Sequence, residues 1–85
     1  MKLRYHKQLQ KQFLSLNARQ RQLCERQLGL FEQDQFHRQL NNHPLRGRYL
    51  GYRSINIGGD RRAVLRQSRD DVVFVTIGTH SQLYG

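Results

Sequence analysis

The sequence predicts an α+β fold, in which an N-terminal helical hairpin packs on a small antiparallel β-sheet. Two observations support this prediction. Residues from about His6 to Leu40 are rich in Gln, Leu, Arg and Glu and contain a single Gly and no Pro, which is typical of helices. The rest of the chain has short β-branched and aromatic stretches between turn residues, which is typical of strands. Since no linker divides the chain, we expect one domain over residues 1–85.

The helical half divides at Asn17 into two predicted helices. In the first helix, Leu9, Phe13 and Leu16 recur at helical spacing and therefore share one face. The second helix is expected over Ala18–Gln33. Its apolar stripe consists of Leu23, Cys24, Leu28, Leu30 and Phe31. The two helices are expected to form an antiparallel pair, with their Gln and Arg side chains in solvent.

The second half predicts an antiparallel meander that follows the loop ending at Pro44. The strands are expected at Tyr49–Ile57, Arg62–Gln67 and Val72–Ile77, with turns at Gly58–Asp60 and Ser68–Asp71. The last strand is apolar on both faces, so we expect it in the interior of the sheet, covered by helices on at least one side. A weak alternation over Lys2–Tyr5 predicts a short additional strand ahead of the helices.

Side chains alternate across a strand, so the parity of the sequence assigns each side chain to one face. The side chains expected to face the helices are Ile55, Ile57, Ala63 and Leu65. Those expected on the opposite face are Tyr52, Ser54, Asn56, Arg62, Val64 and Arg66, flanked by His43 and His80. Arginine neutralises phosphate, and tyrosine stacks on bases with about 1–3 kcal/mol per base, so this face has the composition of a single-stranded RNA site.

The overall charge also predicts a polyanionic partner. The chain contains 15 Lys and Arg against 6 Asp and Glu, a formal net charge of +9. Such a balance favours nucleic acid, an acidic protein or both, although a merely solvated basic surface is the simpler alternative. Arginine supplies most of the positive charge, and its planar fork binds phosphate in a bidentate way, which favours phosphate as the target.

Other classes of protein are disfavoured by what the sequence contains. Cys24 is the only cysteine, so no intrachain disulfide forms, and we expect it to be a buried small hydrophobe. The lone thiol and the lack of a signal-peptide pattern predict a cytoplasmic protein. No segment is apolar enough to predict a membrane span. We find no metal-ligand spacing, phosphate-binding Gly loop or Ser–His–Asp arrangement, so no metal or other cofactor is expected.

Four segments together resemble a known family of bacterial toxins. They are His43-Pro44-Leu45-Arg46-Gly47, Gly51-Tyr52-Arg53, Gly59-Asp60 and Gly78–Gly85. The motifs HPLxGxxxGYR and GTHSxLY occur at the spacing of the YafQ branch of the RelE/ParE toxin superfamily, and the matching segments cover about half of the chain. The helical half is similar to this family only in its pattern.

This resemblance implies a toxin of a type II toxin–antitoxin system that cleaves mRNA in the ribosomal A site. The expected reaction uses the 2′-OH of the RNA as nucleophile and no metal, so it needs a base, an acid and cations that stabilise the phosphorane. The resemblance further implies two partners, the ribosome and an acidic cognate antitoxin. Operator DNA would be reached only through the antitoxin, since the chain has no helix-turn-helix pattern.

The resemblance also implies roles for individual residues. His80 is expected to be the principal acid or base, with Asp60 and His43 as partners in proton transfer or positioning. Arg62 corresponds to a phosphate-stabilising arginine and Tyr84 to an aromatic residue near the scissile nucleotide. Taken singly, His80, His43, Asp60 and Arg62 are each better explained as ordinary surface, turn or strand residues. The acid is not distinguished from the base. Further RNA contacts are expected from Arg46, Arg48, Tyr52, Arg53, Asn56, Arg61 and Arg66.

Three positions depart from the family pattern and support a second hypothesis. Some members carry a catalytic histidine where this chain has Asn56, and aromatics are frequent where it has Arg61 and Leu65. An amide cannot shuttle protons, and the lost aromatics reduce stacking. The alternative is therefore an attenuated or non-catalytic RNA- or ribosome-binding protein that acts mainly in the antitoxin complex and in co-repression. The joint retention of His80, Asp60, His43 and Tyr84 favours the endoribonuclease.

Overall fold

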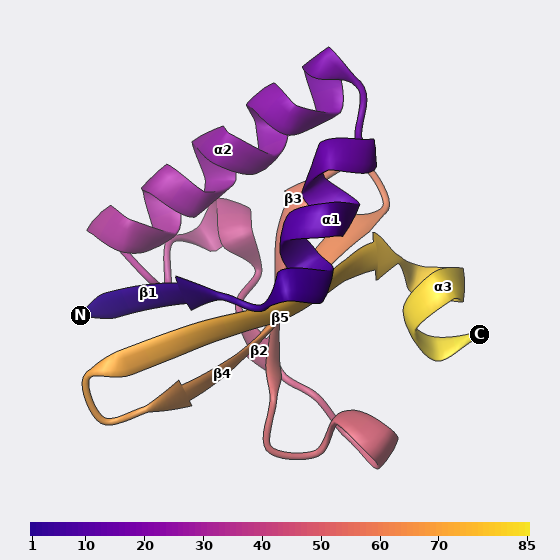
Figure 1. Cartoon of the computed structure of the whole chain (residues 1–85). Helices are drawn as coiled ribbons and strands as arrows, with labels where there is room; N and C mark the ends of the chain where they lie inside the picture. The colour runs from indigo at the N-terminus through magenta and orange to yellow at the C-terminus, as the bar shows by residue number, and fades with distance from the viewer.

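Five strands form a mixed sheet in the order β1-β5-β4-β3-β2, and two of the helices cover one of its faces (Figure 1). The computed structural model describes all 85 residues. In chain order, the elements are β1 Lys2–Tyr5, α1 Lys7–Ser15, α2 Ala18–Gln33, the 3₁₀ turn η1 Arg38–Leu40, β2 His43–Pro44, the 3₁₀ turn η2 Gly47–Tyr49, β3 Arg53–Gly58, β4 Arg61–Ser68, β5 Asp71–Thr79 and α3 His80–Tyr84. None of the helices has the length and hydropathy of a membrane-spanning segment.

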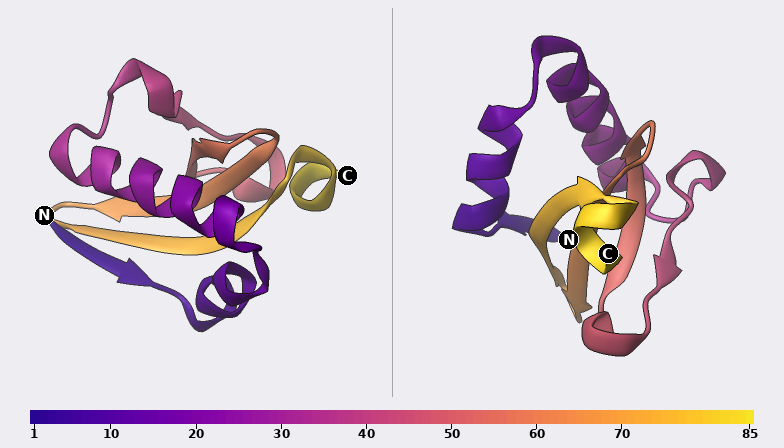
Figure 2. Two further views of the ribbon diagram at one scale, coloured as in Figure 1. Left: turned by 90° about the horizontal axis from the view of Figure 1, so that it is seen from above. Right: turned by 90° about the vertical axis from the view of Figure 1, so that its right-hand side faces the viewer.

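The two predicted helices are confirmed, and the break between them lies at Asn17 as predicted. The Asn17 side chain accepts a hydrogen bond from the N–H of Gln20 at 2.8 Å, and the Gln20 side chain accepts one from the N–H of Asn17 at 3.0 Å. This capping box starts α2 at Ala18. The helices diverge from this turn, so that α1 lies on β5 and α2 lies on β3 (Figures 1 and 2). Each helix thus covers its own part of the sheet, and the predicted antiparallel pairing of the two helices is corrected, because they pack on the sheet and not along each other.

The meander β3-β4-β5 is antiparallel as predicted, but the sheet as a whole is not. Strand β1 pairs in parallel with β5, with Leu3 opposite Val72. The predicted purely antiparallel sheet is therefore corrected to a mixed one. This pairing joins segments at opposite ends of the chain, with no connecting turn whose residues could have revealed it. It also places β5 between two strands, as its apolar sequence predicted.

The first meander strand is shorter than the predicted Tyr49–Ile57, because it begins only at Arg53. Gly47 and Gly51 have φ angles of +65° and +91°, a region that glycine enters without strain. Gly47 begins the 3₁₀ turn η2 and Gly51 follows it, so Arg48 and Tyr49 belong to a turn and not to the strand.

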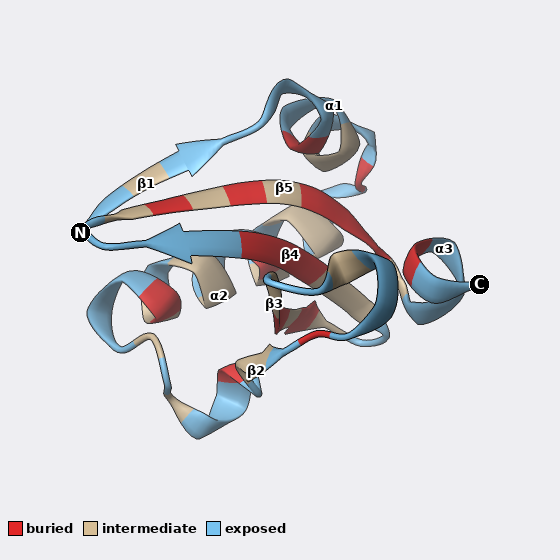
Figure 3. Ribbon diagram, turned by 90° about the horizontal axis from the view of Figure 1, so that it is seen from below, coloured by how far each residue is buried: buried red, intermediate tan, exposed pale blue.

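The predicted division of the sheet into two faces is confirmed by two hydrophobic clusters. The main core lies under α1 and α2 and contains Leu9, Leu16, Cys24, Phe31, Leu40, Ile55, Ile57, Ala63, Leu65, Val72, Phe74 and Ile77. On the other face, Leu45, Val64 and Leu83 form a second cluster with Tyr49, Tyr52 and Val75 packed around it. The buried stretches of β4 and β5 therefore have apolar contacts on both sides (Figure 3).

A side chain of α1 completes the outer edge of β5. Strand β1 ends at Tyr5, opposite Phe74, so residues 75–79 have no strand beside them there. The side chain of Gln12 bonds to this edge where a strand is lacking. Its Oε1 accepts the N–H of Ile77 at 2.7 Å, and its Nε2 donates to Thr76 Oγ1 at 3.0 Å. A buried backbone N–H without a partner is costly, so this contact joins the hairpin to the sheet.

Replacing Gln12 by Ala removes the partner of the Ile77 N–H. We expect the free energy of unfolding to fall by about 1–3 kcal/mol, the cost of leaving one part-buried donor unsatisfied. Urea unfolding followed by circular dichroism measures this change. The matched control is Gln22→Ala on the exposed side of α2, for which we expect a change within about 0.5 kcal/mol. Equal changes in the two variants would show that Gln12 does not support the β5 edge.

Cys24 is fully buried against the sheet, and burial raises the pKa of its thiol to about 11. An unfolded cysteine titrates near 8.5, so at higher pH the unfolded chain loses its proton first. We expect this contribution to stability to be complete below pH of about 8.5 and to disappear as the pH rises towards 11. In urea titrations from pH 8 to 10.5, the parent should lose more stability than Cys24→Ala. Equal losses of stability in the parent and in Cys24→Ala would rule out the raised pKa of Cys24.

Candidate functional site

A groove of about 490 Å³ lies on the face of the sheet that carries Val64, away from the helical hairpin. We call it the histidine groove and define it by its lining residues, which are Asn41, His43, Pro44, Leu45, Arg46, Ser54, Arg62, His80 and Tyr84. It brings together four residues predicted to be catalytic: His43 from β2, Arg62 from β4, and His80 and Tyr84 from α3. These residues are widely separated in the sequence, so the fold assembles the groove.

The histidine groove is held together by the second hydrophobic cluster. Leu45 follows His43 by two residues, and Leu83 lies between His80 and Tyr84. Both leucines form one cluster with Val64 of β4, which lies two residues after Arg62. The same apolar contacts that bury these leucines therefore bring the flanking polar residues to one place.

His43 is held in a defined tautomer by a backbone carbonyl. Its Nδ1 lies 2.8 Å from the carbonyl oxygen of Asn41. A carbonyl can only accept a hydrogen bond, so the neutral His43 ring carries its proton on Nδ1. The Nε2 atom then has a free lone pair and can take a proton. Asn41 has a left-handed φ of +47°, a conformation in which asparagine is one of the few tolerated residues.

Arg62 is anchored to the turn between β3 and β4 through one of its terminal nitrogens. Its Nη1 lies 3.3 Å from Asn56 Oδ1, 3.2 Å from the Gly59 carbonyl and 3.1 Å from the Arg61 carbonyl. The other donors of the guanidinium make no hydrogen bond within the protein. Asn56 Oδ1 also accepts the N–H of Gly58 at 3.1 Å. Arg62 is therefore a positioned cation whose remaining N–H donors are free to bind an anion.

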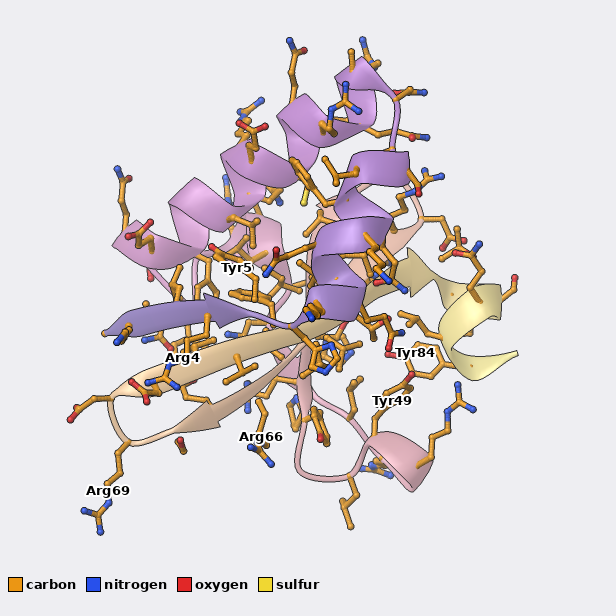
Figure 4. All side chains as sticks on the ribbon, in the orientation of Figure 1. Arg4, Tyr5, Tyr49, Arg66, Arg69 and Tyr84 are labelled. Carbon is orange, nitrogen blue, oxygen red and sulfur yellow. The ribbon has the colours of Figure 1, made fainter.

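Aromatic rings form a continuous group at the α3 end of the groove. The rings of His80 and Tyr84 are 4.9 Å apart between centroids, and Tyr84 meets Tyr49 edge-on at 5.8 Å. Figure 4 shows Tyr49 and Tyr84 next to each other between η2 and α3. Tyr84 is 39% exposed, so part of its side chain is accessible to a flat ligand.

Two further arginines are free to bind an anion. Arg46 lines the groove, and Arg66 extends from β4 away from the helices (Figure 4). Both side chains are exposed and make no hydrogen bond or ion pair within the protein. Arg48, by contrast, donates from Nη2 to the carbonyl oxygen of Leu83 at 2.7 Å.

The remaining predicted residues do not line the histidine groove. Asp60 is exposed in the turn between β3 and β4, and Tyr52 packs on the second hydrophobic cluster. Arg53 has the parity of the helix-facing residues, and its Nε donates to Asn42 Oδ1 at 2.7 Å. Arg61 lines a different pocket, between α1 and α3. The roles of these residues in RNA cleavage or binding stay predictions.

Two polar residues of the groove, Asn41 and Ser54, have no individual role predicted from the sequence. Asn41 fixes the His43 ring through a main-chain atom, for which a side-chain pattern gives no signal. Ser54 lies opposite His43 in the β2–β3 ladder, and its buried hydroxyl has no hydrogen-bond partner in the protein. Parity placed Ser54 on this face, but nothing in the sequence distinguished it from a structural serine.

Comparisons with known proteins agree with this fold. A family model described as "Bacterial toxin of type II toxin-antitoxin system, YafQ" matches residues 1–85. A YoeB/ParE toxin from Agrobacterium tumefaciens is similar in structure, with a TM-score of 0.77, 21% identity and coverage of 94% of this chain and 99% of that chain. YafQ from E. coli has a TM-score of 0.74 at 20% identity, covering 98% of this chain and 97% of its own.

The same E. coli toxin in its DinJ–YafQ complex gives a TM-score of 0.68, again at 20% identity and with 98% and 97% coverage. At these identities the solved structures show the fold alone. No match to a curated protein is found.

We expect neutral His43 to carry its proton on Nδ1, because the Asn41 carbonyl accepts it. Long-range ¹H–¹⁵N NMR, recorded at a pH at which the imidazoles are neutral, reports the tautomer of each ring. His6 and His37 are internal controls, because their Nδ1 atoms accept the N–H groups of Gln8 and Gln39 and their protons must lie on Nε2. A His43 ring protonated on Nε2 would contradict the assignment of its free lone pair.

Proposed function

The chain belongs to the YafQ family of bacterial toxins of type II toxin–antitoxin systems, and on this premise we propose that it is a ribosome-dependent endoribonuclease that cleaves mRNA. The observation that supports this proposal best is the meeting of His43, Arg62 and His80 in one open groove. Cleavage through the 2′-OH needs a base, an acid and a cation near the phosphate. The histidine groove contains one candidate for each role.

The tautomer of His43 supports its assignment as the base. Its Nε2 lone pair takes the proton of the 2′-OH, and the 2′-oxygen then forms a bond to phosphorus. The P–O5′ bond breaks, and His80, which makes no hydrogen bond within the protein, protonates the leaving 5′-oxygen. The products are a 2′,3′-cyclic phosphate and a 5′-hydroxyl, so atoms and charges balance without a redox partner. Arg62 stabilises the charge that develops on the phosphorane.

Substrate binding is assigned to the residues around these groups. Tyr84 offers the exposed face of its ring for stacking next to the scissile phosphate. Arg46 and Arg66 are free to bind flanking phosphates. Because the groove is open and lies on the outside of the sheet, it suits a single strand held by a larger scaffold. The mRNA in the ribosomal A site is such a strand.

We also propose an acidic antitoxin as the partner that inhibits this chain. E. coli YafQ forms a complex with DinJ, and the net charge of +9 favours an acidic protein. Operator DNA would be bound through that antitoxin.

A second candidate function is a binding protein with little or no cleavage. The position of Asn56 favours it, because an amide anchoring Arg62 cannot replace a proton-transferring histidine. Family members often have an aromatic residue at the position of Arg61, and Arg61 lies outside the groove. This candidate differs from the first in one measurable respect. Binding survives removal of the 2′-OH from the RNA, whereas cleavage does not.

We expect His80→Ala to lower the cleavage rate by about 10²–10⁴-fold, the usual contribution of a general acid or base, with ribosome binding largely retained. Primer extension on a translated message detects the cuts, and sedimentation with ribosomes measures binding. The control is His6→Asn, which retains a cap for α1 away from the groove and should cleave like the parent.

Codon-phased cuts that disappear when the message carries a 2′-deoxy nucleotide at the scissile position would support the endoribonuclease. A parent that binds ribosomes but makes no cut would establish the binding protein instead. Loss of ribosome binding in His80→Ala, to the same extent as loss of cleavage, would contradict the role of His80 in proton transfer.

A further inference from the structure

Helix α3 carries both His80 and Tyr84, yet it is too short to be stable alone. It has one turn, and isolated helices below about 12–15 residues are marginal in water. Its start is fixed by a capping box between Thr79 and Gln82, and Leu83 is buried at 3% exposure. These contacts fix the first turn and one face. The carbonyl end of the helix needs a further partner.

Arg48 is that partner. Its Nη2 donates to the carbonyl oxygen of Leu83 at 2.7 Å, a short charge-assisted hydrogen bond to one of the terminal carbonyls of α3. A cation in this position also interacts favourably with the negative end of a helix. The guanidinium carbon lies 5.1 Å from the centroid of the Tyr49 ring, and Tyr49 in turn contacts Tyr84 edge-on at 5.8 Å. The turn η2 therefore holds α3 at two points, one polar and one aromatic.

We propose that Arg48 is a positioning residue that fixes α3, and with it His80 and Tyr84, in the orientation that cleavage requires. This inference rests on the proposed function for its kinetic consequence. It gives Arg48 a different role from the phosphate contact expected from the sequence, because Arg48 Nη2 is bonded to the end of α3. Arg46 is a neighbour of equal charge that is exposed, lines the groove and has no partner in the protein. It is the natural comparison.

The kinetic test compares Arg48→Met with Arg46→Met on programmed ribosomes. Both variants lose one charge and keep an apolar side chain. We expect Arg48→Met to lower kcat by about 10–100-fold, the usual effect of a small misplacement of reacting groups, with KM and its salt dependence near those of the parent. Arg46→Met should raise KM and reduce the salt slope by about one, with kcat near that of the parent. Arg48→Lys, which keeps a cationic donor, should recover most of the lost kcat.

A structural readout tests the same inference without cleavage. The His80 ring lies 4.9 Å from Tyr84, so its proton resonances carry a ring-current shift, and the Gly85 N–H is protected by a 2.8 Å hydrogen bond to the Ser81 carbonyl. In Arg48→Met we expect the His80 shifts to move towards random-coil values and Gly85 exchange to accelerate. Arg46→Met should leave both unchanged.

The inference is overturned if Arg48→Met leaves the NMR signals of α3 unchanged, or if it raises KM as Arg46→Met does while kcat is retained. A parent that does not cleave contradicts the proposed function instead, and the NMR comparison still decides the role of Arg48.

Discussion

The contact of Leu45 and Leu83 with Val64 is the constraint on which the site depends. It ties a loop from the middle of the chain and a short helix from its end to the outer face of β4. Arg62 is two residues from Val64 on the same strand, so their side chains share a face and lie about 7 Å apart. Hydrophobic burial alone has no preferred direction. Because Val64 and Arg62 occupy fixed positions on the same face of β4, burial of the two leucines against Val64 brings His43 and His80 close to Arg62.

The features predicted from the sequence are those that local rules govern. The residues that stop α1 and start α2 lie within a few positions of Asn17, and alternation along β3 and β4 assigned the two faces correctly. The parallel pairing of β1 with β5 depends on the whole intervening chain, and no short window contains it. The same alternation places Arg53 with the helix-facing residues, so its expected RNA contact conflicts with the rule that assigned its neighbours.

The candidate site was predictable in part as a set of residues, since Asp60 lies outside the groove, and its hydrogen bonds were not predictable. Residue types at the family's spacing predicted His43, Arg62, His80 and Tyr84, and the fold groups all four. Sequence could not separate Arg46, which is free, from Arg48, which is bound to α3, because both are exposed arginines flanking one glycine. Nor could it show that Asn56, a departure from the family pattern, links Arg62 to the Gly58 N–H. Only the three-dimensional structure distinguishes these roles.

The charge of the protein limits how an acidic antitoxin can inhibit the proposed reaction. Only one ion pair, between Arg4 and Asp71 at 3.6 Å, neutralises any of the arginines, and none of the groove cations takes part in it. The molecule measures 33 × 29 × 26 Å, whereas charges in water are screened over about 8 Å at physiological salt. Acidic residues bound beyond the helical hairpin would therefore leave the attraction between Arg46, Arg62 and phosphate almost intact. Inhibition by charge requires the antitoxin to reach the face of the sheet that carries the histidine groove.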